Sequence, residues 1–317
     1  MSKSSTIAAT AERRVPVSTA DGVELAVHEY GPAHAELTVV LLHGHCQRAQ
    51  TWTRVRDELL RQYPGARVIC YDHRGHGASG AAAHRTYNLE QLGADLRTVL
   101  ETVAPTGPIV LVGHSMGGMT VLTYLSQHAH EIGDRIAGVA LIATAANGLA
   151  ESGFGRLLRH PLITLFQAAV RWAPHPMQYA KHLARKAFAP IVRGAADGRA
   201  VGPRLLSLAN AMHNETSVVT MASFLRAFTD YDRTHVLAAL SRIPTLVLCG
   251  SADPMTPPSH SVAMAAAVDY SDLVLIPGAG HSVILEQPAR VAEALTRLLT
   301  RAGGPTTPAR AHLRLVA

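Results

Sequence analysis

The sequence predicts an α/β fold in which a mostly parallel central sheet carries helices on both faces and also an inserted helical segment. Short runs of aliphatic and β-branched residues alternate along the chain with longer segments whose apolar residues recur at helical spacing. This alternation is typical of a parallel sheet with crossover helices. It stops near Asn147 and resumes after Tyr231, and this interruption indicates the insertion.

The first part of the chain has the pattern of a hairpin followed by four buried strands. Residues 15–18 and 23–30 alternate in polarity around Ala20-Asp21-Gly22, which is typical of a β-hairpin. Continuous apolar runs then predict strands buried on both faces. The strands are expected at 37–42, 67–71, 109–113 and 135–142, and the helices near 52–63, from 88 to 103 and directly after Ser115.

The second part begins with helix-like stretches that are repeatedly broken by proline. A segment of about 85 residues is too long for a loop in a compact domain, so we expect a helical subdomain here. Strands at 245–248 and 273–276 and helices at 257–267 and 286–300 then complete the sheet. The predicted organisation is a flexible leader (1–14), a core domain (15–146 and 232–302), a helical insertion (147–231) and a flexible tail (303–317).

The composition excludes several classes of protein. The chain has 317 residues, of which 48% are hydrophobic and 16% charged, so it can bury one large core. Cys46, Cys70 and Cys249 are widely spaced, which favours free thiols in a reducing compartment. No cysteine or histidine spacing suggests zinc, and we expect no metal and no cofactor. Without a signal-peptide core or an apolar run of about 18 residues, the sequence predicts a cytoplasmic protein with no transmembrane segment.

The net charge of +6 is concentrated in one region. Residues 147–235 carry 11 Lys and Arg against 5 Asp and Glu, whereas residues 1–146 carry 12 against 13. Few aromatic residues accompany this charge and there is no nucleic-acid motif, so nucleic-acid binding is not expected. Two interpretations stay open: a solvated helix face whose long side chains cover apolar surface, or a surface that attracts anionic substrates, a carrier-bound acyl group or an acidic membrane.

Gly113-His114-Ser115-Met116-Gly117 fits the pattern G-x-S-x-G, the nucleophile elbow, and lies between an expected strand and an expected helix. A serine in so sharp a turn has a strained backbone, and the flanking glycines leave room for neighbouring chain segments. The hydroxyl then stands exposed at the carboxyl end of a central strand. An ordinary glycine-rich turn is the alternative interpretation.

A nucleophilic serine needs a base and a group that orients the base. Asp253 and His281 each follow an expected strand, and the order Ser…Asp…His is that of α/β-hydrolases. Taken singly, Asp253 could be a turn-forming Asp-Pro and His281 one of 18 histidines. Because both fall at strand ends in this order, we predict a triad of Ser115, His281 and Asp253.

Acyl transfer also needs two fixed donors for the developing oxyanion. The backbone N–H of Met116, directly after the nucleophile, is one candidate. The backbone N–H of His45, in the loop after the strand at 37–42, is the other. This role does not require the His45 side chain, so the identity of that residue bears on the substrate instead.

Together, these motifs resemble those of the serine α/β-hydrolase superfamily, and most of all its esterase, lipase and cofactor-free haloperoxidase-like branch. The nucleophile is Ser rather than the Asp of epoxide hydrolases, and the HGGG oxyanion motif is absent. The resemblance implies that residues 147–231 form a cap, or lid, over the acyl pocket. It also implies a mainly structural role for the loop at 72–79. The motifs that carry the resemblance are HGHCQRAQTW (43–52), YDHRGHGAS (71–79), GHSMGG (113–118), GSADP (250–254) and GAGHSVILEQP (278–288).

We therefore expect a carboxylic ester hydrolase that acts on small hydrophobic substrates through an acyl-enzyme. Three alternatives keep the triad and change the substrate to a thioester, a lactone or a carbon–carbon bond. A further alternative is a ligand receptor built on a hydrolase scaffold. The sequence leaves the acyl and alcohol specificity and the oligomeric state open.

Overall fold

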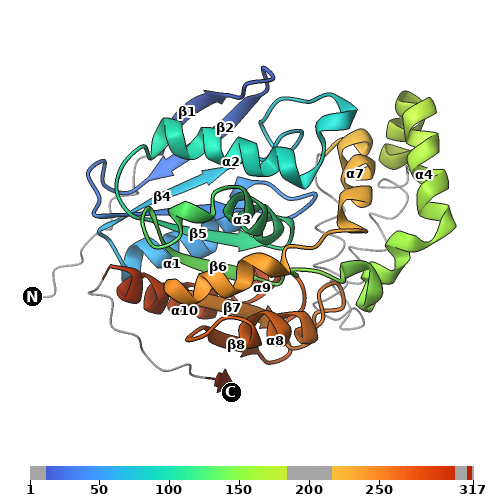
Figure 1. Ribbon diagram of the computed structural model, residues 1–317. Helices are drawn as coiled ribbons and strands as arrows, with labels where there is room; N and C mark the ends of the chain where they lie inside the picture. Colours follow the sequence, from blue (N-terminus) through green and yellow to red (C-terminus); the bar gives the residue numbers. More distant parts are fainter. Residues whose placement is uncertain (1–11, 184–215, 304–312, 316–317) are drawn as a thin grey trace, which may run out of the picture.

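A computed structural model describes residues 12–183, 216–303 and 313–315 of the chain. Strands of these residues form one sheet in the order β1-β2-β4-β3-β5-β6-β7-β8-β9 (Figure 1). Their bounds are β1 (Arg13–Ser18), β2 (Glu24–Tyr30), β3 (Leu37–Leu42), β4 (Ala66–Tyr71), β5 (Ile109–His114), β6 (Ile136–Ile142), β7 (Thr245–Gly250), β8 (Asp272–Ile276) and β9 (Leu313–Leu315).

The sheet is mostly parallel, as predicted. Only β2 runs against its two neighbours, β1 and β4, and every other pair is parallel. The predicted hairpin is confirmed, with Val15 opposite Val27. Its turn places Gly22 at φ 81°, a conformation that glycine adopts without steric cost. In this arrangement β3, β5, β6, β7 and β8 all present their carboxyl ends at one edge of the sheet.

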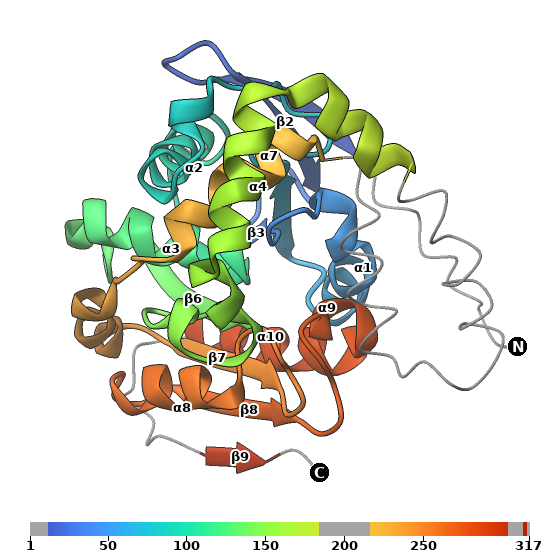
Figure 2. The ribbon, with the colours of Figure 1, turned by 90° about the vertical axis from the view of Figure 1, so that its right-hand side faces the viewer.

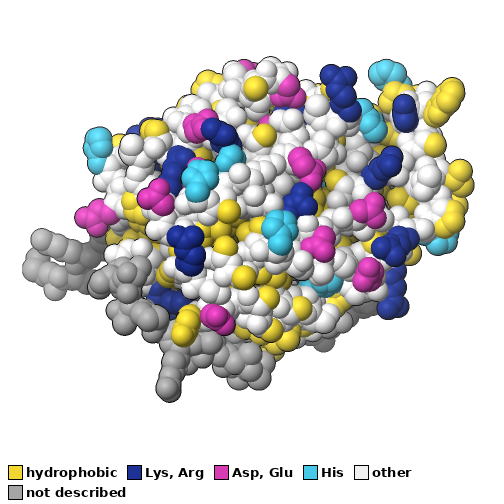
Figure 3. Space-filling model, viewed as in Figure 1, with side chains coloured by type: hydrophobic (Ala, Val, Ile, Leu, Met, Phe, Trp, Pro, Cys, Tyr) yellow, Lys and Arg dark blue, Asp and Glu magenta, His cyan; other side chains and the backbone are white. Residues whose placement is uncertain are grey.

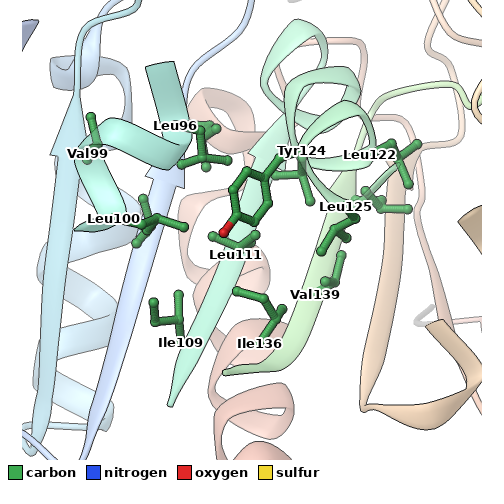
Figure 4. Close-up of a cluster of buried hydrophobic side chains, with 14 of the residues drawn as sticks. Leu96, Val99, Leu100, Ile109, Leu111, Leu122, Tyr124, Leu125, Ile136 and Val139 are labelled. Atoms are coloured by element: carbon green, nitrogen blue, oxygen red, sulfur yellow. The ribbon is translucent and has the colours of Figure 1, made fainter. Parts of the chain in front are cut away.

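Helices cover both faces of this sheet. One face carries α2, α3 and α8, and the other carries α1, α9 and α10. The side chains of β5 alternate between the two faces: Ile109 and Leu111 pack on the first, and Val110 and Val112 on the second. Figure 4 shows the first face, where α2 and α3 close over β5 and β6. The helix bounds are α1 (Thr53–Gln62), α2 (Leu89–Val103), α3 (Met116–Gln127), α8 (Pro258–Ala266), α9 (Val283–Glu286) and α10 (Pro288–Ala302).

The helix expected at 286–300 is present as α10 but begins two residues later, at Pro288. The chain forms the short helix α9, breaks at Gln287 and starts again as α10 at Pro288. Proline has no N–H to donate and disfavours helical geometry in the residue before it, and Gln287 indeed has φ −136° and ψ 53°. The other expected helices are present, with ends shifted by a few residues.

Between β6 and β7 the chain leaves the sheet and returns to the same place. The Arg233 N–H donates to the Ala146 carbonyl over 2.8 Å, so the segment between them starts and ends at one point. This is the geometry that the proposed insertion at 147–231 requires. Its described part contains 3₁₀ turns, the helices α4 (Pro161–Trp172) and α7 (Val218–Leu225), and a further helical stretch at 174–183. Helices α4 and α7 lie beyond the ends of the strands in Figure 1 and in front of the sheet in Figure 2.

Both chain ends depart from the predicted boundaries. Arg13 and Arg14, assigned to the flexible leader, are part of β1. In the tail expected to be flexible, Leu313–Leu315 forms β9 and pairs in parallel with β8. The backbone groups on the outer edge of β8 would otherwise lack strand partners, which makes this edge a natural place for a further strand. The rest of the leader and the tail beyond Gly303 lie outside the described residues.

Candidate active site

Ser115 stands in a sharp turn between β5 and α3. Its backbone has φ 53° and ψ −119°, a strained conformation for any residue with a side chain. The glycines on either side are required by close packing. A Cβ on Gly113 would lie 2.4 Å from the Gly117 backbone, and one on Gly117 would lie 2.3 Å from the Leu42 carbonyl oxygen. The predicted steric basis of the elbow is therefore present.

His281 and Asp253 lie beside this serine. The distance from His281 Nε2 to Ser115 Oγ is 3.0 Å, and that from His281 Nδ1 to Asp253 Oδ2 is 2.8 Å. Asp253 follows β7 and His281 follows β8, so neighbouring parallel strands deliver both groups to the same edge. The Ala252 N–H also donates to the Ala279 carbonyl over 3.0 Å, which ties the two loops together. The structure thus brings together the three residues that the sequence singled out.

The Asp253 carboxylate is buried and has several hydrogen-bond donors around it. Oδ1 accepts from the N–H groups of Met255 (2.8 Å) and Thr256 (3.0 Å), and Oδ2 accepts from the Thr256 hydroxyl (2.7 Å) as well as from His281. Burial disfavours the charged form, but the attraction to His281 and the bonds from Thr256 outweigh it and hold the pKa of Asp253 below its usual value. Asp253 therefore both shapes its turn and orients His281.

Three supporting residues were not predicted. His114 lies 2.8 Å through Nε2 from the His281 carbonyl oxygen and fixes the loop that carries His281. Thr256 anchors Asp253, and the Gln47 side chain accepts from the Gly44 N–H over 3.0 Å. His114 occupies the variable position of G-x-S-x-G, where the motif gives no signal. Position 256 could have been suspected from its nearness to Asp253 in the sequence.

The loop after β3 lies directly against Ser115. A Cβ placed on Gly44 would lie 3.1 Å from Ser115 Cβ and 3.0 Å from His114 Nδ1. His45 follows Gly44 in this loop, and Met116 is the first residue of α3, where backbone N–H groups lack intrahelical acceptors. Both candidate oxyanion donors therefore adjoin Ser115, and their role stays a proposal.

The loop at 72–79 supports the site through neutral histidines. His43 Nε2 accepts from the His73 N–H over 3.0 Å, and His76 Nε2 accepts from the Cys46 N–H over 3.2 Å. Burial lowers the pKa of His43 to about 4 and that of His76 to about 3, so near neutral pH both rings are uncharged and able to accept. This arrangement favours the structural interpretation of the loop.

Arg74 of the same loop forms a buried ion pair with Asp95 of α2. Two bonds of 2.6 Å join the guanidinium to the carboxylate, and both side chains are fully buried. We predict that Arg74→Met lowers the free energy of unfolding by about 3–5 kcal/mol, because it leaves the Asp95 charge buried without its partner. Urea unfolding measures the loss.

The control for this prediction is Arg97→Met. Arg97 makes an exposed pair with Glu101 on the same helix, so its removal should leave the urea midpoint unchanged. Equal midpoints for Arg74→Met and the wild type would contradict a structural role for Arg74.

An apolar wall lies over the start of α3. Met116 and Met119 pack in one cluster with Phe224, Phe228 and Tyr231 of the insertion. The Tyr231 hydroxyl donates to the Met119 carbonyl over 3.0 Å and anchors this end of the insertion to the core. The first turn after Ser115 thus faces aromatic and thioether side chains, which suit an apolar substrate.

His45 joins the same wall from the loop after β3. Its ring centroid lies 5.8 Å from that of Phe224 and 5.4 Å from that of Phe228.

Within residues 12–183, 216–303 and 313–315, no group of three or more His, Cys, Asp or Glu side chains is arranged to hold a metal ion. No helix in these ranges is long and apolar enough to cross a bilayer.

Known proteins share this architecture. A family model described as the α/β hydrolase fold matches residues 38–288. The chain is 28% identical to a thermophilic esterase from Thermogutta terrifontis, and the two structures align with a TM-score of 0.64 over 92% of this chain and 100% of that one. A bromoperoxidase from Bacillus anthracis aligns with a TM-score of 0.68 at 22% identity, over 91% of this chain and 100% of its own, which shows the fold alone.

A relative with a named reaction extends the comparison. The 3-oxoadipate enol-lactonase 2 of Acinetobacter baylyi is 27% identical over 237 residues, which cover 74% of this chain and 79% of the lactonase. The family model spans most of the chain, from β3 to the start of α10, and includes every strand end that carries a candidate site residue. The chain therefore belongs to the α/β hydrolase family and has its fold.

Proposed function

We propose that this hydrolase cleaves carboxylic esters of hydrophobic substrates through an acyl-enzyme intermediate. The observation that carries the proposal is the continuous hydrogen-bonded chain from Ser115 through His281 to Asp253, with distances of 3.0 and 2.8 Å. The strained elbow adds to it, because it presents the hydroxyl outside the helix that follows.

In the first half of the proposed reaction, Ser115 Oγ attacks the ester carbonyl carbon. His281 Nε2 accepts the hydroxyl proton, and the ionised Asp253 stabilises the imidazolium that forms. The carbonyl oxygen becomes an oxyanion that accepts hydrogen bonds from the N–H groups of His45 and Met116. When this intermediate collapses, the carbon–oxygen bond of the ester breaks and His281 returns the proton to the leaving alcohol.

In the second half, water takes the place of the alcohol. His281 removes a proton from it, the hydroxide attacks the acyl carbon, and the bond to Ser115 Oγ breaks as the serine regains its proton. The products are an acid and an alcohol, and the enzyme is unchanged. No metal or cofactor takes part in any of these proposed steps.

The apolar wall formed by Met116, Met119, Phe224 and Phe228 supports a hydrophobic substrate, and we propose that residues 147–231 act as the cap that covers it. The similarity to an esterase and to an enol-lactonase keeps a lactone as the first alternative, with thioesters, carbon–carbon bonds and a ligand receptor behind it. A cytoplasmic location also remains a prediction.

Labelling with a fluorophosphonate tests the proposal most directly. We expect one adduct by intact mass, on the peptide that contains Ser115, and turnover of p-nitrophenyl esters that the label abolishes. A panel of acyl-CoA thioesters and lactones then separates the remaining substrates. A protein that takes the label but turns over no member of the panel would favour the receptor alternative.

We predict that Asp253→Asn lowers kcat/KM by about 10⁴-fold, as expected for a triad carboxylate. The amide would present a donor to His281 Nδ1 and so favour the tautomer with the proton on Nε2, which cannot accept the Ser115 proton. Steady-state rates on a p-nitrophenyl ester measure the effect. The matched control is Asp269→Asn, because Asp269 is exposed and lies outside the site. Comparable rates for the two variants would rule out the assigned role of Asp253.

A further inference from the structure

The described part of the chain exposes eight large hydrophobic side chains, and six of them lie in one segment of the insertion. These six are between 56% and 87% exposed, the most exposed being Trp172. We call them the cap patch. Its members are Leu157, Leu162, Leu165, Trp172, Tyr179 and Leu183.

Half of the patch lies on the outer side of α4, whose inner side is already packed, and Tyr179 and Leu183 lie on the next helical stretch, 174–183. On α4, Phe166 and Val170 contact α7 through Val218 and Ala222. Leu162, Leu165 and Trp172 are spaced by three and seven residues, so they share one side of α4. This side differs from the one that packs on α7. Figure 2 shows α4 as the outermost helix in front of α7, and Figure 3 shows hydrophobic side chains protruding over α4. These side chains therefore do not serve the packing of the cap on the core.

The charged side chains of the patch's own segment have a single sign. Residues 152–196 contain no Asp or Glu. Arg156, Arg159 and Arg171 are exposed within or beside the patch, and of these only Arg159 approaches an acid, Glu151, at 3.7 Å. In Figure 3, Lys and Arg side chains stand next to the hydrophobic ones at this edge of the molecule.

This combination of exposed apolar side chains and basic side chains favours one kind of partner over another. A symmetric dimer would place the same basic surface on both sides of the contact, with no acid of this segment to neutralise it. An anionic bilayer surface instead offers acidic headgroups to the arginines and acyl chains to the leucines. Trp172 directly follows Arg171, and Tyr179 lies two positions before Lys181. Tryptophan and tyrosine are the aromatic types that favour the headgroup level of a membrane.

We propose that the cap patch binds the surface of anionic phospholipid membranes, with α4 lying in the plane of the interface. The leucines enter the boundary between headgroups and acyl chains, and Arg159 and Arg171 extend their charged ends to lipid phosphates. The binding goes beyond the proposed hydrolysis and does not depend on it.

The chain contains its own reporter for this test. It has two tryptophans; Trp52 is fully buried, whereas Trp172 is 87% exposed, so a change in tryptophan emission on adding vesicles reports the patch. With vesicles of phosphatidylcholine containing about 30% phosphatidylglycerol, we expect a blue shift, quenching by brominated acyl chains and co-sedimentation. Binding should weaken at least tenfold when the ionic strength rises, because salt screens the charges, and also when phosphatidylglycerol is omitted.

The double variant Leu162→Ser/Leu165→Ser and the variant Arg171→Gln should each bind these vesicles at least tenfold more weakly. Val262→Ser is the matched control, since Val262 is an exposed hydrophobic residue on α8 that does not belong to the patch. All variants should retain wild-type rates on a short water-soluble ester, and Ser115→Ala should bind vesicles like the wild type. Failure of hydrolysis would therefore leave the membrane result intact.

Three results would overturn the proposal. One is equal vesicle binding by the wild type and the double serine variant. Another is a concentration-dependent dimer that the double variant abolishes while vesicles bind neither protein, since a second copy of the chain would then cover the patch. Capture of an acidic protein without vesicle binding would likewise contradict it.

Discussion

Ser115→Ala should reduce kcat/KM for ester hydrolysis by about 10⁴- to 10⁶-fold, the range expected when a triad nucleophile is removed. The variant keeps the elbow but has no oxygen at the position 3.0 Å from His281 Nε2. Only the oxyanion donors and substrate binding would then remain to accelerate hydrolysis. Rates on a p-nitrophenyl ester, measured beside thermal unfolding, give the effect per folded molecule.

Ser259→Ala is the control for this experiment, because Ser259 is an exposed serine on α8. We expect it to match the wild type in rate and in unfolding temperature. If Ser115→Ala retained most of the activity at an unchanged unfolding temperature, the nucleophile would have to be sought elsewhere. If Ser115→Ala lost its activity because it unfolded, the labelling of Ser115 in the wild-type protein would still test whether Ser115 is the nucleophile.

Acid should unfold this protein at an unusually high pH. Burial is the main cause that lowers the pKa of five imidazoles around the site. The pKa values fall to about 4 for His43 and about 3 for His45, His76 and His114, while that of His73 lies well below its usual range.

The sign of the effect follows from proton linkage. In the unfolded chain these rings bind protons below a pKa near 6.5, whereas in the folded protein they do not until much lower pH, so the unfolded state takes up more protons. The free energy of unfolding should therefore fall as the pH drops from about 6.5 towards 4, by about 1.4 kcal/mol per pH unit for each ring. Urea midpoints measured across this window test the slope.

His76→Gln isolates one ring. The glutamine amide oxygen can still accept from the Cys46 N–H but does not titrate, so the variant should show a shallower pH dependence than the wild type. His34→Gln, at an exposed position, should leave the slope unchanged. Equal slopes for His76→Gln and the wild type would mean that His76 takes up its proton without unfolding.

The sequence predicts the frame of this fold because its signals are local. Continuous apolar runs mark the strands, and the elbow is recognisable because glycine is sterically required at positions 113 and 117 on either side of the nucleophile. Asp253 and His281 could be named because parallel strands deliver their carboxyl ends to one edge. Each of these inferences uses a few neighbouring residues and one rule of topology.

The contacts that were missed depend on residues far apart in the chain. His114 holds the carbonyl of His281, 167 positions away, and no local pattern reveals such a bond. The pairing of β9 with β8 likewise depends on an open sheet edge, which is a property of the assembled sheet. By contrast, the start of α10 had a local signal in Pro288, and the helix expected at 286–300 began only two residues too early.

The hydrogen bond between Arg233 and Ala146 has a consequence for how this scaffold can be re-engineered. Because the insertion starts and ends at one point, changing its length alters mainly the entropy of closing a loop, by about 0.6 kcal/mol for each doubling. The part that follows Thr216 is fixed to the core through Phe224 and Tyr231. Among the described residues ahead of it, α4 packs on α7 rather than on the sheet, so a different helix in its place should change which molecules reach Ser115 without rebuilding the sheet that holds it.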